Sequence, residues 1–136
     1  MSSGSLEPGL YHIKSQLSGQ YLTVLFPGNG KTVAQPEKGA PFEFSFDGPD
    51  LVISFEGIPL GIAGSDVVAQ PFVPQVGWKV KKAETQNAWV FTGADESKAW
   101  WFDPEEEKNL TIRPLIATLS IPPQYLPTEL FVLEKE

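Results

Sequence analysis

The sequence predicts an all-β protein made of three repeated units, and two observations carry this prediction. Residues 32–36 (TVAQP) return as residues 67–71 (VVAQP) and, more loosely, as residues 110–114 (LTIRP). Each copy precedes a loop and then a short run of alternating apolar residues, which is the pattern of a half-buried strand. The 13 Pro and 12 Gly of this 136-residue chain separate many short segments, as expected for an all-β protein with many turns.

Apolar alternation and turn signals predict four strands in each unit. The first unit has expected strands at residues 9–15, 21–26, 32–35 and 42–46, divided by turns such as 17–20 (LSGQ) and 28–31 (GNGK). The second has them at 50–55, 59–62, 67–70 and 78–82, and the third at 88–92, 99–102, 110–113 and 130–134. Pro36, Pro71 and Pro114 each end the third strand of a unit, because proline cannot donate to a strand ladder. The repeated proline indicates that the units are structurally equivalent.

Three four-stranded units that close into a barrel capped by hairpins define the β-trefoil fold. We expect a single domain over residues 1–136, with units at about 9–47, 50–82 and 87–135. Apolar positions repeated in the units are expected to fill one core: Leu22, Val33, Phe44, Ile53, Leu60, Val68, Trp78, Val90, Trp101, Ile112 and Phe131. In such a fold the loops carry the function.

The composition limits the classes of function. A net charge of −7 argues against nucleic acid as a partner, because such binders need a basic surface. The absence of cysteine excludes disulfides and Cys-type zinc sites, and it favours a cytoplasmic location. Residues 1–9 do not resemble a signal peptide, and no apolar run reaches the ~20 residues of a membrane helix. We expect a monomer with no cofactor, no metal and no membrane partner.

Residues able to carry catalysis are scarce, so an enzyme is not expected. The sole histidine, His12, falls in the first strand, where we predict an outer-face position, and no nucleophile elbow accompanies it. The metalloprotease and nucleotide-binding motifs are also missing. The acidic run Asp103, Glu105, Glu106 and Glu107 lies in a predicted hairpin loop, and we interpret it as a solvated turn that can tune the choice of partner by its charge.

Three tryptophans raise the alternative of a carbohydrate-binding lectin, because Trp89, Trp100 and Trp101 could form an aromatic platform for a sugar. Adjacent residues of a strand face opposite ways. At most one of Trp100 and Trp101 can therefore lie in the core, and we favour packing roles for these side chains.

The strongest candidate site is the loop formed by Phe26, Pro27, Gly28, Asn29, Gly30 and Lys31. It is exposed by its position between two strands, is stiffened by Pro27 and contains one basic residue. A rigid loop with a lysine can enter the S1 pocket of a trypsin-like protease, whose floor is a carboxylate. Rigidity helps because a preorganised loop loses little entropy on binding. The alternative is an ordinary hairpin turn with a solvated Lys31.

The last loop, residues 115–129, is the longest in the chain. Three prolines, Pro122, Pro123 and Pro127, stiffen it. Its apolar residues are expected to anchor it to the rest of the protein: Leu119, Ile121, Tyr125 and Leu126. We therefore predict that this loop is packed.

Two stretches of the chain resemble known families. Residues 11–15 (YHIKS) and 19–22 (GQYL) resemble the opening of many fungal β-trefoils, ricin-B-type lectins among them. Residues 113–116 (RPLI) and 122–131 (PPQYLPTELF) resemble the C-terminal part of the mushroom serine protease inhibitors called mycospins. The second resemblance is the more specific one.

The resemblance to mycospins implies a cytosolic, cysteine-free β-trefoil that inhibits trypsin-like serine proteases through one surface loop. It also implies that this loop joins the second and third strands and offers a basic residue to the protease, which matches the loop above with Lys31 as the favoured S1 residue. Because Lys31 lies at the end of the loop, other residues stay open. Phe26 or Leu25 would suit a chymotrypsin-like pocket, and Asn29 would suit an asparaginyl endopeptidase, as in the related mycocypins. Lys98 and Lys108 are basic alternatives in other segments, and a second loop that binds a protease of another class is also open.

The lectin alternative lacks its motif. Ricin-B-type lectins carry Gln-x-Trp near the end of each repeat, whereas residues 75–78 (QVGW) are one residue too long. The sequence therefore predicts a protease inhibitor, with a β-trefoil lectin as the alternative.

Overall fold

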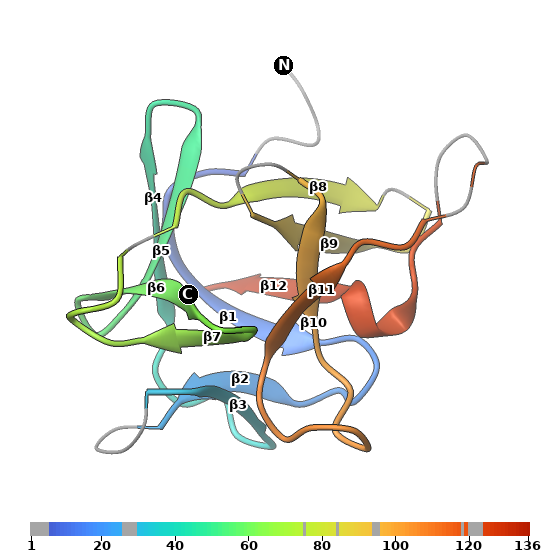
Figure 1. The fold of residues 1–136 in the computed structure, drawn as a ribbon, viewed down its shortest axis with the longest axis horizontal. Helices are drawn as coiled ribbons and strands as arrows, with labels where there is room; N and C mark the ends of the chain where they lie inside the picture. Colours follow the sequence, from blue (N-terminus) through green and yellow to red (C-terminus); the bar gives the residue numbers. More distant parts are fainter. Residues whose placement is uncertain are drawn as a thin grey trace.

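The computed structural model describes residues 6–25, 30–74, 76–83, 85–93, 96–117, 119 and 124–136. Its elements are twelve strands and one short 3-10 helix (Figure 1). The strands are β1 (Gly9–Ser15), β2 (Tyr21–Val24), β3 (Thr32–Gln35), β4 (Phe42–Asp47), β5 (Asp50–Phe55), β6 (Ile58–Ala63), β7 (Asp66–Ala69), β8 (Lys79–Ala83), β9 (Ala88–Thr92), β10 (Lys98–Trp101), β11 (Thr111–Pro114) and β12 (Phe131–Lys135), and the 3-10 helix is η1 (Pro127–Glu129). No helix in the described part of the chain is long and apolar enough to span a membrane.

A closed barrel forms one half of the molecule. Its circuit of antiparallel neighbours runs β1–β4–β5–β8–β9–β12 and returns to β1. The link between β5 and β8 is a single bridge in which Leu51 and Trp78 exchange backbone hydrogen bonds of 2.9 and 2.8 Å. Closure satisfies the strand edges that an open sheet would leave exposed. The predicted β-trefoil fold is confirmed.

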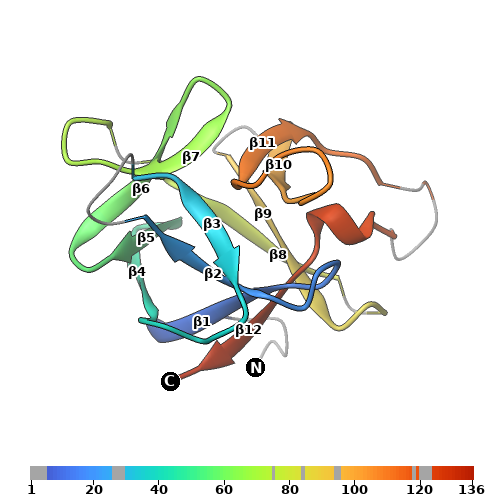
Figure 2. The same ribbon diagram turned by 90° about the horizontal axis from the view of Figure 1, so that it is seen from below.

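Three hairpins, β2–β3, β6–β7 and β10–β11, form a cap on one end of the barrel. Figure 2 shows them arranged around the centre of this face. Three residue pairs tie each hairpin to the next in a cyclic order: Lys31 with Val68, Asp66 with Thr111, and Asn109 with Val33. Lys31, Asp66 and Asn109 are therefore equivalent positions of the three units, and each lies directly before a copy of the repeated segment.

The barrel is filled by an aromatic cluster around Phe91. The Phe91 ring stacks on Trp100 with centroids 4.4 Å apart, and Phe44 and Phe131 meet Phe91 edge-on. Trp78 packs edge-on against Trp100 at 5.4 Å. Such aromatic pairs contribute beyond the area that they bury.

A second, smaller cluster lies outside the barrel, against β8, β9 and β12. It contains Ala83, Ala88, Val90, Ala99 and Leu130, and Leu115 and Tyr125 pack on it from the β11–β12 connection. The prediction of one common core is therefore wrong for Val90. Phe91 faces the barrel, so strand alternation turns its neighbour Val90 to the other side.

Two further predicted core residues are only partly buried, namely Val33 and Trp101. On β3 the buried residue is Thr32, so strand alternation turns its neighbour Val33 to the other side. Trp101 lies on the outer side of β10 because Trp100 is the inward neighbour. The expectation that at most one of these two tryptophans is core is confirmed. The predicted strands are all present with bounds shifted by up to a few residues, whereas η1 was not predicted.

Candidate functional site

The base of the β2–β3 loop is fixed by backbone hydrogen bonds. The amide of Leu25 donates to the carbonyl of Lys31 at 3.1 Å, and the amide of Gly30 donates to the carbonyl of Leu25 at 3.3 Å. The carbonyl of Gly30 also accepts the amide of Ala69 at 2.8 Å. Gly30 has φ of 74°, and a Cβ there would lie 2.7 Å from the oxygen of Ala69, so only glycine fits. The two ends of the loop therefore lie close together at its base, and the base is fixed against β7.

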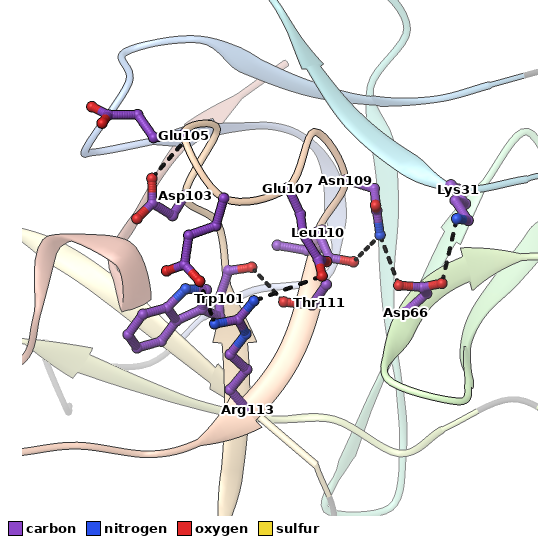
Figure 3. Close-up of polar contacts among 11 residues, drawn as sticks. Lys31, Asp66, Trp101, Asp103, Glu105, Glu107, Asn109, Leu110, Thr111 and Arg113 are labelled. Atoms are coloured by element: carbon purple, nitrogen blue, oxygen red, sulfur yellow. Dashed lines mark hydrogen bonds and ion pairs between the residues drawn. The ribbon is translucent and has the colours of Figure 1, made fainter.

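The side chain of Lys31 lies at the centre of the cap. Its Nζ is 3.6 Å from Oδ2 of Asp66, while Oδ1 of Asp66 accepts a hydrogen bond of 2.9 Å from Nδ2 of Asn109 (Figure 3). The side chains of Lys31 and Asp66 are 39% and 27% exposed. Asp66 thus contacts the equivalent residues of both other units, and Lys31 is a partly buried member of this network instead of a fully solvated lysine.

The other residues of the predicted site, and its basic alternatives, do not join the network around Asp66 in the described part of the chain. Phe26, Pro27, Gly28 and Asn29 lie outside the described residues. Of the two basic alternatives, Lys98 is an exposed strand residue at the start of β10, and Lys108 is exposed in the β10–β11 loop. The structure thus brings Lys31 together with Asp66 and Asn109, and it brings neither Lys98 nor Lys108 into that network.

The acidic run lies in the β10–β11 loop, as predicted, and its charges are partly paired. Arg113 on β11 places its guanidinium 3.1 Å from Glu106. The guanidinium also lies 3.9 Å from Glu107 and 5.4 Å from the ring centroid of Trp101 (Figure 3). Oδ1 of Asp103 accepts the amide of Glu105 at 3.0 Å, which closes the turn. These contacts give the acidic residues a local structural role.

The tryptophans offer no open platform for a sugar. Trp78 and Trp100 are fully buried, and the guanidinium of Arg113 lies over Trp101. The half-buried Trp89 is covered by the ammonium of Lys82, 5.3 Å from the ring centroid. Stacking of a sugar on Trp100, the sequence-based alternative, would require the barrel core to open.

The β11–β12 connection presents an apolar side chain whose predicted position is wrong. Leu119, predicted as an anchor, is fully exposed at 102%, and Leu126 is 38% exposed. Ala117 and Tyr125 form a bridge between the two stems of the connection. Tyr125 does pack on the second cluster, as expected, and Ile121 lies outside the described residues.

Two side chains hold the backbone of this connection. Gln86, in the β8–β9 turn, accepts the amide of Tyr125 and donates to its carbonyl, both at 2.9 Å. Glu129 of η1 is fully buried, and its carboxylate accepts the amide of Ile116 at 2.8 Å and the amide of Leu126 at 3.1 Å. Burial raises the pKa of Glu129, and the two backbone hydrogen bonds oppose this shift. The length and proline content of residues 115–129 were the sequence signal for a special loop, but nothing in the sequence pointed to Gln86 or Glu129.

Side chains for catalysis or metal binding do not gather in the described part of the chain. His12 lies on the outer side of β1, where it was predicted, but it is buried, with Nε2 2.5 Å from a carboxylate oxygen of Glu136. Among the described residues, no group of three His, Cys, Asp or Glu side chains could hold a metal ion.

Comparison with known structures places the fold among β-trefoil proteins. A proteinase inhibitor from Coprinopsis cinerea superposes with a TM-score of 0.86 at 22% identity over 97% of this chain and 100% of that one. A ricin B-like lectin from Macrolepiota procera, solved in complex with lactose, gives 0.74 at 11% identity over 97% of this chain and 99% of that one. An endo-β-galactosidase from Clostridium perfringens gives 0.75 at 15% identity, over 93% of this chain and 32% of that one. Curated protein sequences gave no significant match.

The fold and its projecting loops define a β-trefoil binding protein. The sequence model of the family peptidase inhibitor I66 matches residues 4–135, and the chain belongs to this family. The protein is therefore a protease inhibitor and not an enzyme, and the resemblance to the mushroom inhibitors is confirmed.

Proposed function

We propose that this protein inhibits trypsin-like serine proteases through the β2–β3 loop, with Lys31 as the residue that enters the S1 pocket. The proposal depends on the fixed base of the loop, where backbone hydrogen bonds join Gly30 and Lys31 to Leu25, and Gly30 to Ala69. A loop that is fixed at its base loses less conformational entropy when a protease binds it than a loop with a mobile base. Family membership supplies the protease as the partner. The absence of cysteine supports a cytoplasmic site of action for a monomeric inhibitor.

The ion pair between Lys31 and Asp66 must be exchanged for the S1 carboxylate in this proposal. Both side chains are about one third exposed, and pairs near the surface contribute at most about 1 kcal/mol. Close charge pairs buried in a protein interface couple by roughly 1.5–7 kcal/mol. The exchange therefore favours the complex. Asn29 and Phe26 remain the proposed alternatives if the lysine stays with Asp66.

Titration of trypsin with the purified protein tests this proposal. We expect residual activity to fall linearly and to reach its minimum at one inhibitor per protease, since the proposed inhibitor is a monomer with one trypsin-binding loop. A parallel titration of chymotrypsin tests whether the protein offers an apolar residue to an S1 pocket. If neither protease loses activity at micromolar inhibitor, the proposed serine-protease specificity is wrong.

A specific observation favours a second protease-binding loop. We propose that the β11–β12 connection binds a protease with an apolar S1 pocket, because Leu119 is fully exposed on a connection whose stems are bridged and held by side chains. An exposed leucine can fill an apolar pocket of a partner, and a connection held at its stems loses less conformational entropy on binding.

Replacement of Leu119 by alanine is expected to weaken chymotrypsin inhibition at least tenfold and to leave trypsin inhibition unchanged. The physical reason is the loss of the side chain that would fill the S1 pocket. The matched control is Leu17→Ala, which removes a leucine that is 44% exposed elsewhere on the surface. Inhibition constants for both proteases give the result. Equal chymotrypsin inhibition by Leu119→Ala and Leu17→Ala would exclude Leu119 as the contact.

A further inference from the structure

The carboxylate of Glu129 connects the two stems of the β11–β12 connection. It accepts the amide of Ile116 from the outgoing stem and the amide of Leu126 from the returning stem. Its own backbone is fixed, because the amide of Glu129 donates to Leu126 and the neighbouring carbonyl of Thr128 accepts the amide of the buried Phe102. One acidic side chain therefore joins the two stems of the connection, in addition to Gln86, which holds the returning stem at Tyr125.

We propose that Glu129 is the positioning residue of the β11–β12 connection: it holds Ile116 and Leu126 at a fixed spacing, and so fixes the two stems between which Leu119 meets a protease. The proposal rests on the second protease-binding loop proposed above. Glu129 itself is fully buried, so it acts through the backbone that it holds and not by contact with the protease.

The chemistry of the site requires a carboxylate. Two backbone N–H groups point to the two oxygens of Glu129, and an ionised carboxylate offers acceptors on both. A glutamine would offer one acceptor and one donor, so one N–H group would face another donor in a buried place. A buried donor without an acceptor is costly. Aspartate is one methylene shorter and cannot reach both stems from the same backbone position.

The protonation state of Glu129 is expected to change how firmly the connection is held. Burial raises the pKa of Glu129, and no charged side chain of the described residues is among the causes of the shift. As the pH falls through this raised pKa, the carboxyl group takes up a proton and one of its oxygens becomes a donor, so one stem amide loses its acceptor. The connection is expected to loosen at that point.

The effect of acid on the stability of the whole protein is opposite in sign to this local loosening. A carboxyl group with a raised pKa binds protons more readily in the folded state than in the unfolded state. Its contribution therefore makes the free energy of unfolding larger, not smaller, as the pH falls from the raised pKa toward the ordinary value of 4.5. The loss of order is expected only in the β11–β12 connection, through an opening that separates the stem amides from Glu129 while its carboxyl group stays buried. The two backbone hydrogen bonds lower the pKa of Glu129, so their loss raises this pKa further and acid favours the opening.

Amide hydrogen exchange of the whole protein tests the positioning role. In wild type, the amides of Ile116 and Leu126 are expected to be protected at neutral pH and to lose protection, after correction for intrinsic rates, at mildly acidic pH. In Glu129→Gln, their exchange is expected to be about tenfold faster at neutral pH and to show no further acid-induced loss. The control Glu105→Gln makes the same change at an exposed carboxylate and is expected to match wild type.

Inhibition measured on the same variants distinguishes the two proposals. Glu129→Gln is expected to weaken chymotrypsin inhibition about tenfold and to leave trypsin inhibition through the β2–β3 loop unchanged. If wild type does not inhibit chymotrypsin but the exchange results are as expected, the second loop is wrong and the positioning role stands. If Ile116 and Leu126 exchange alike in wild type and Glu129→Gln, the positioning role is wrong. The wild-type pH series needs no variant, and constant protection across it would also overturn the proposal.

Discussion

Replacing Lys31 by alanine is expected to weaken trypsin inhibition at least tenfold, equivalent to about 1.4 kcal/mol. The S1 pocket of a trypsin-like protease has a carboxylate at its floor, so loss of the ammonium leaves that charge without its partner. The inhibition constant is the measurement, with Lys31→Arg as the conservative variant that keeps the charge and is expected to keep inhibition.

Lys31→Ala also removes the ion pair with Asp66, and a second variant separates the two effects. Asp66→Asn leaves Lys31 in place and removes the negative charge 3.6 Å from its Nζ. If Lys31 enters the S1 pocket, Asp66→Asn is expected to keep trypsin inhibition or to strengthen it, because the lysine no longer has to leave an ion pair. If both variants weaken inhibition equally, Lys31 supports the loop from within the cap and the S1 residue is another one.

Replacing Trp100 by alanine is expected to lower the free energy of unfolding by about 3–5 kcal/mol, the range for large aromatic side chains in a core. Trp100 is fully buried and contacts the rings of Phe91, Trp78 and Phe131. Its removal would leave a cavity in the part of the barrel where the aromatic rings meet. Because the free energy of unfolding of a typical domain is only about 5–15 kcal/mol, this single change would remove a large part of it.

Urea denaturation followed by circular dichroism measures this effect. The matched control is Trp89→Ala, since Trp89 is only half-buried and packs under Lys82; its replacement is expected to cost clearly less. Trp100→Phe retains most of the volume and keeps the test interpretable if the alanine variant does not fold. Equal losses for Trp89→Ala and Trp100→Ala would mean that the aromatic cluster does not dominate the stability of the barrel.

The fold could be predicted from the sequence because its signals repeat. A strand pattern that occurs three times, each time ending at a proline, leaves few architectures other than the trefoil, and all twelve predicted strands are present. The assignment of faces was less certain, because alternation shows that Trp100 and Trp101 point opposite ways without showing which one points inward. That choice depends on the partner strand, in which Ile112 lies opposite Trp100.

The polar network of the cap could be predicted only in part. Lys31, Asp66 and Asn109 each come directly before a copy of the repeated segment, so the sequence shows that their positions are equivalent. Their contacts depend on how close these positions lie to one another in the cap, which the structure shows. The role of Glu129 could not be predicted. Its partners, Ile116 and Leu126, are backbone amides of a connection whose path depends on tertiary packing, and a glutamate in a proline-rich segment ordinarily indicates exposure.

The cyclic pairing of the cap hairpins separates what the fold must keep from what it can vary. Each hairpin is tied to the next near the base of its loop by backbone pairs at Lys31, Asp66 and Asn109, and these pairs do not depend on which side chains the loops carry. The tips can therefore exchange residues or change in length while the bases keep the cap closed. In a scaffold of this kind, the protease that the loops recognise can change while the core and the cap stay the same.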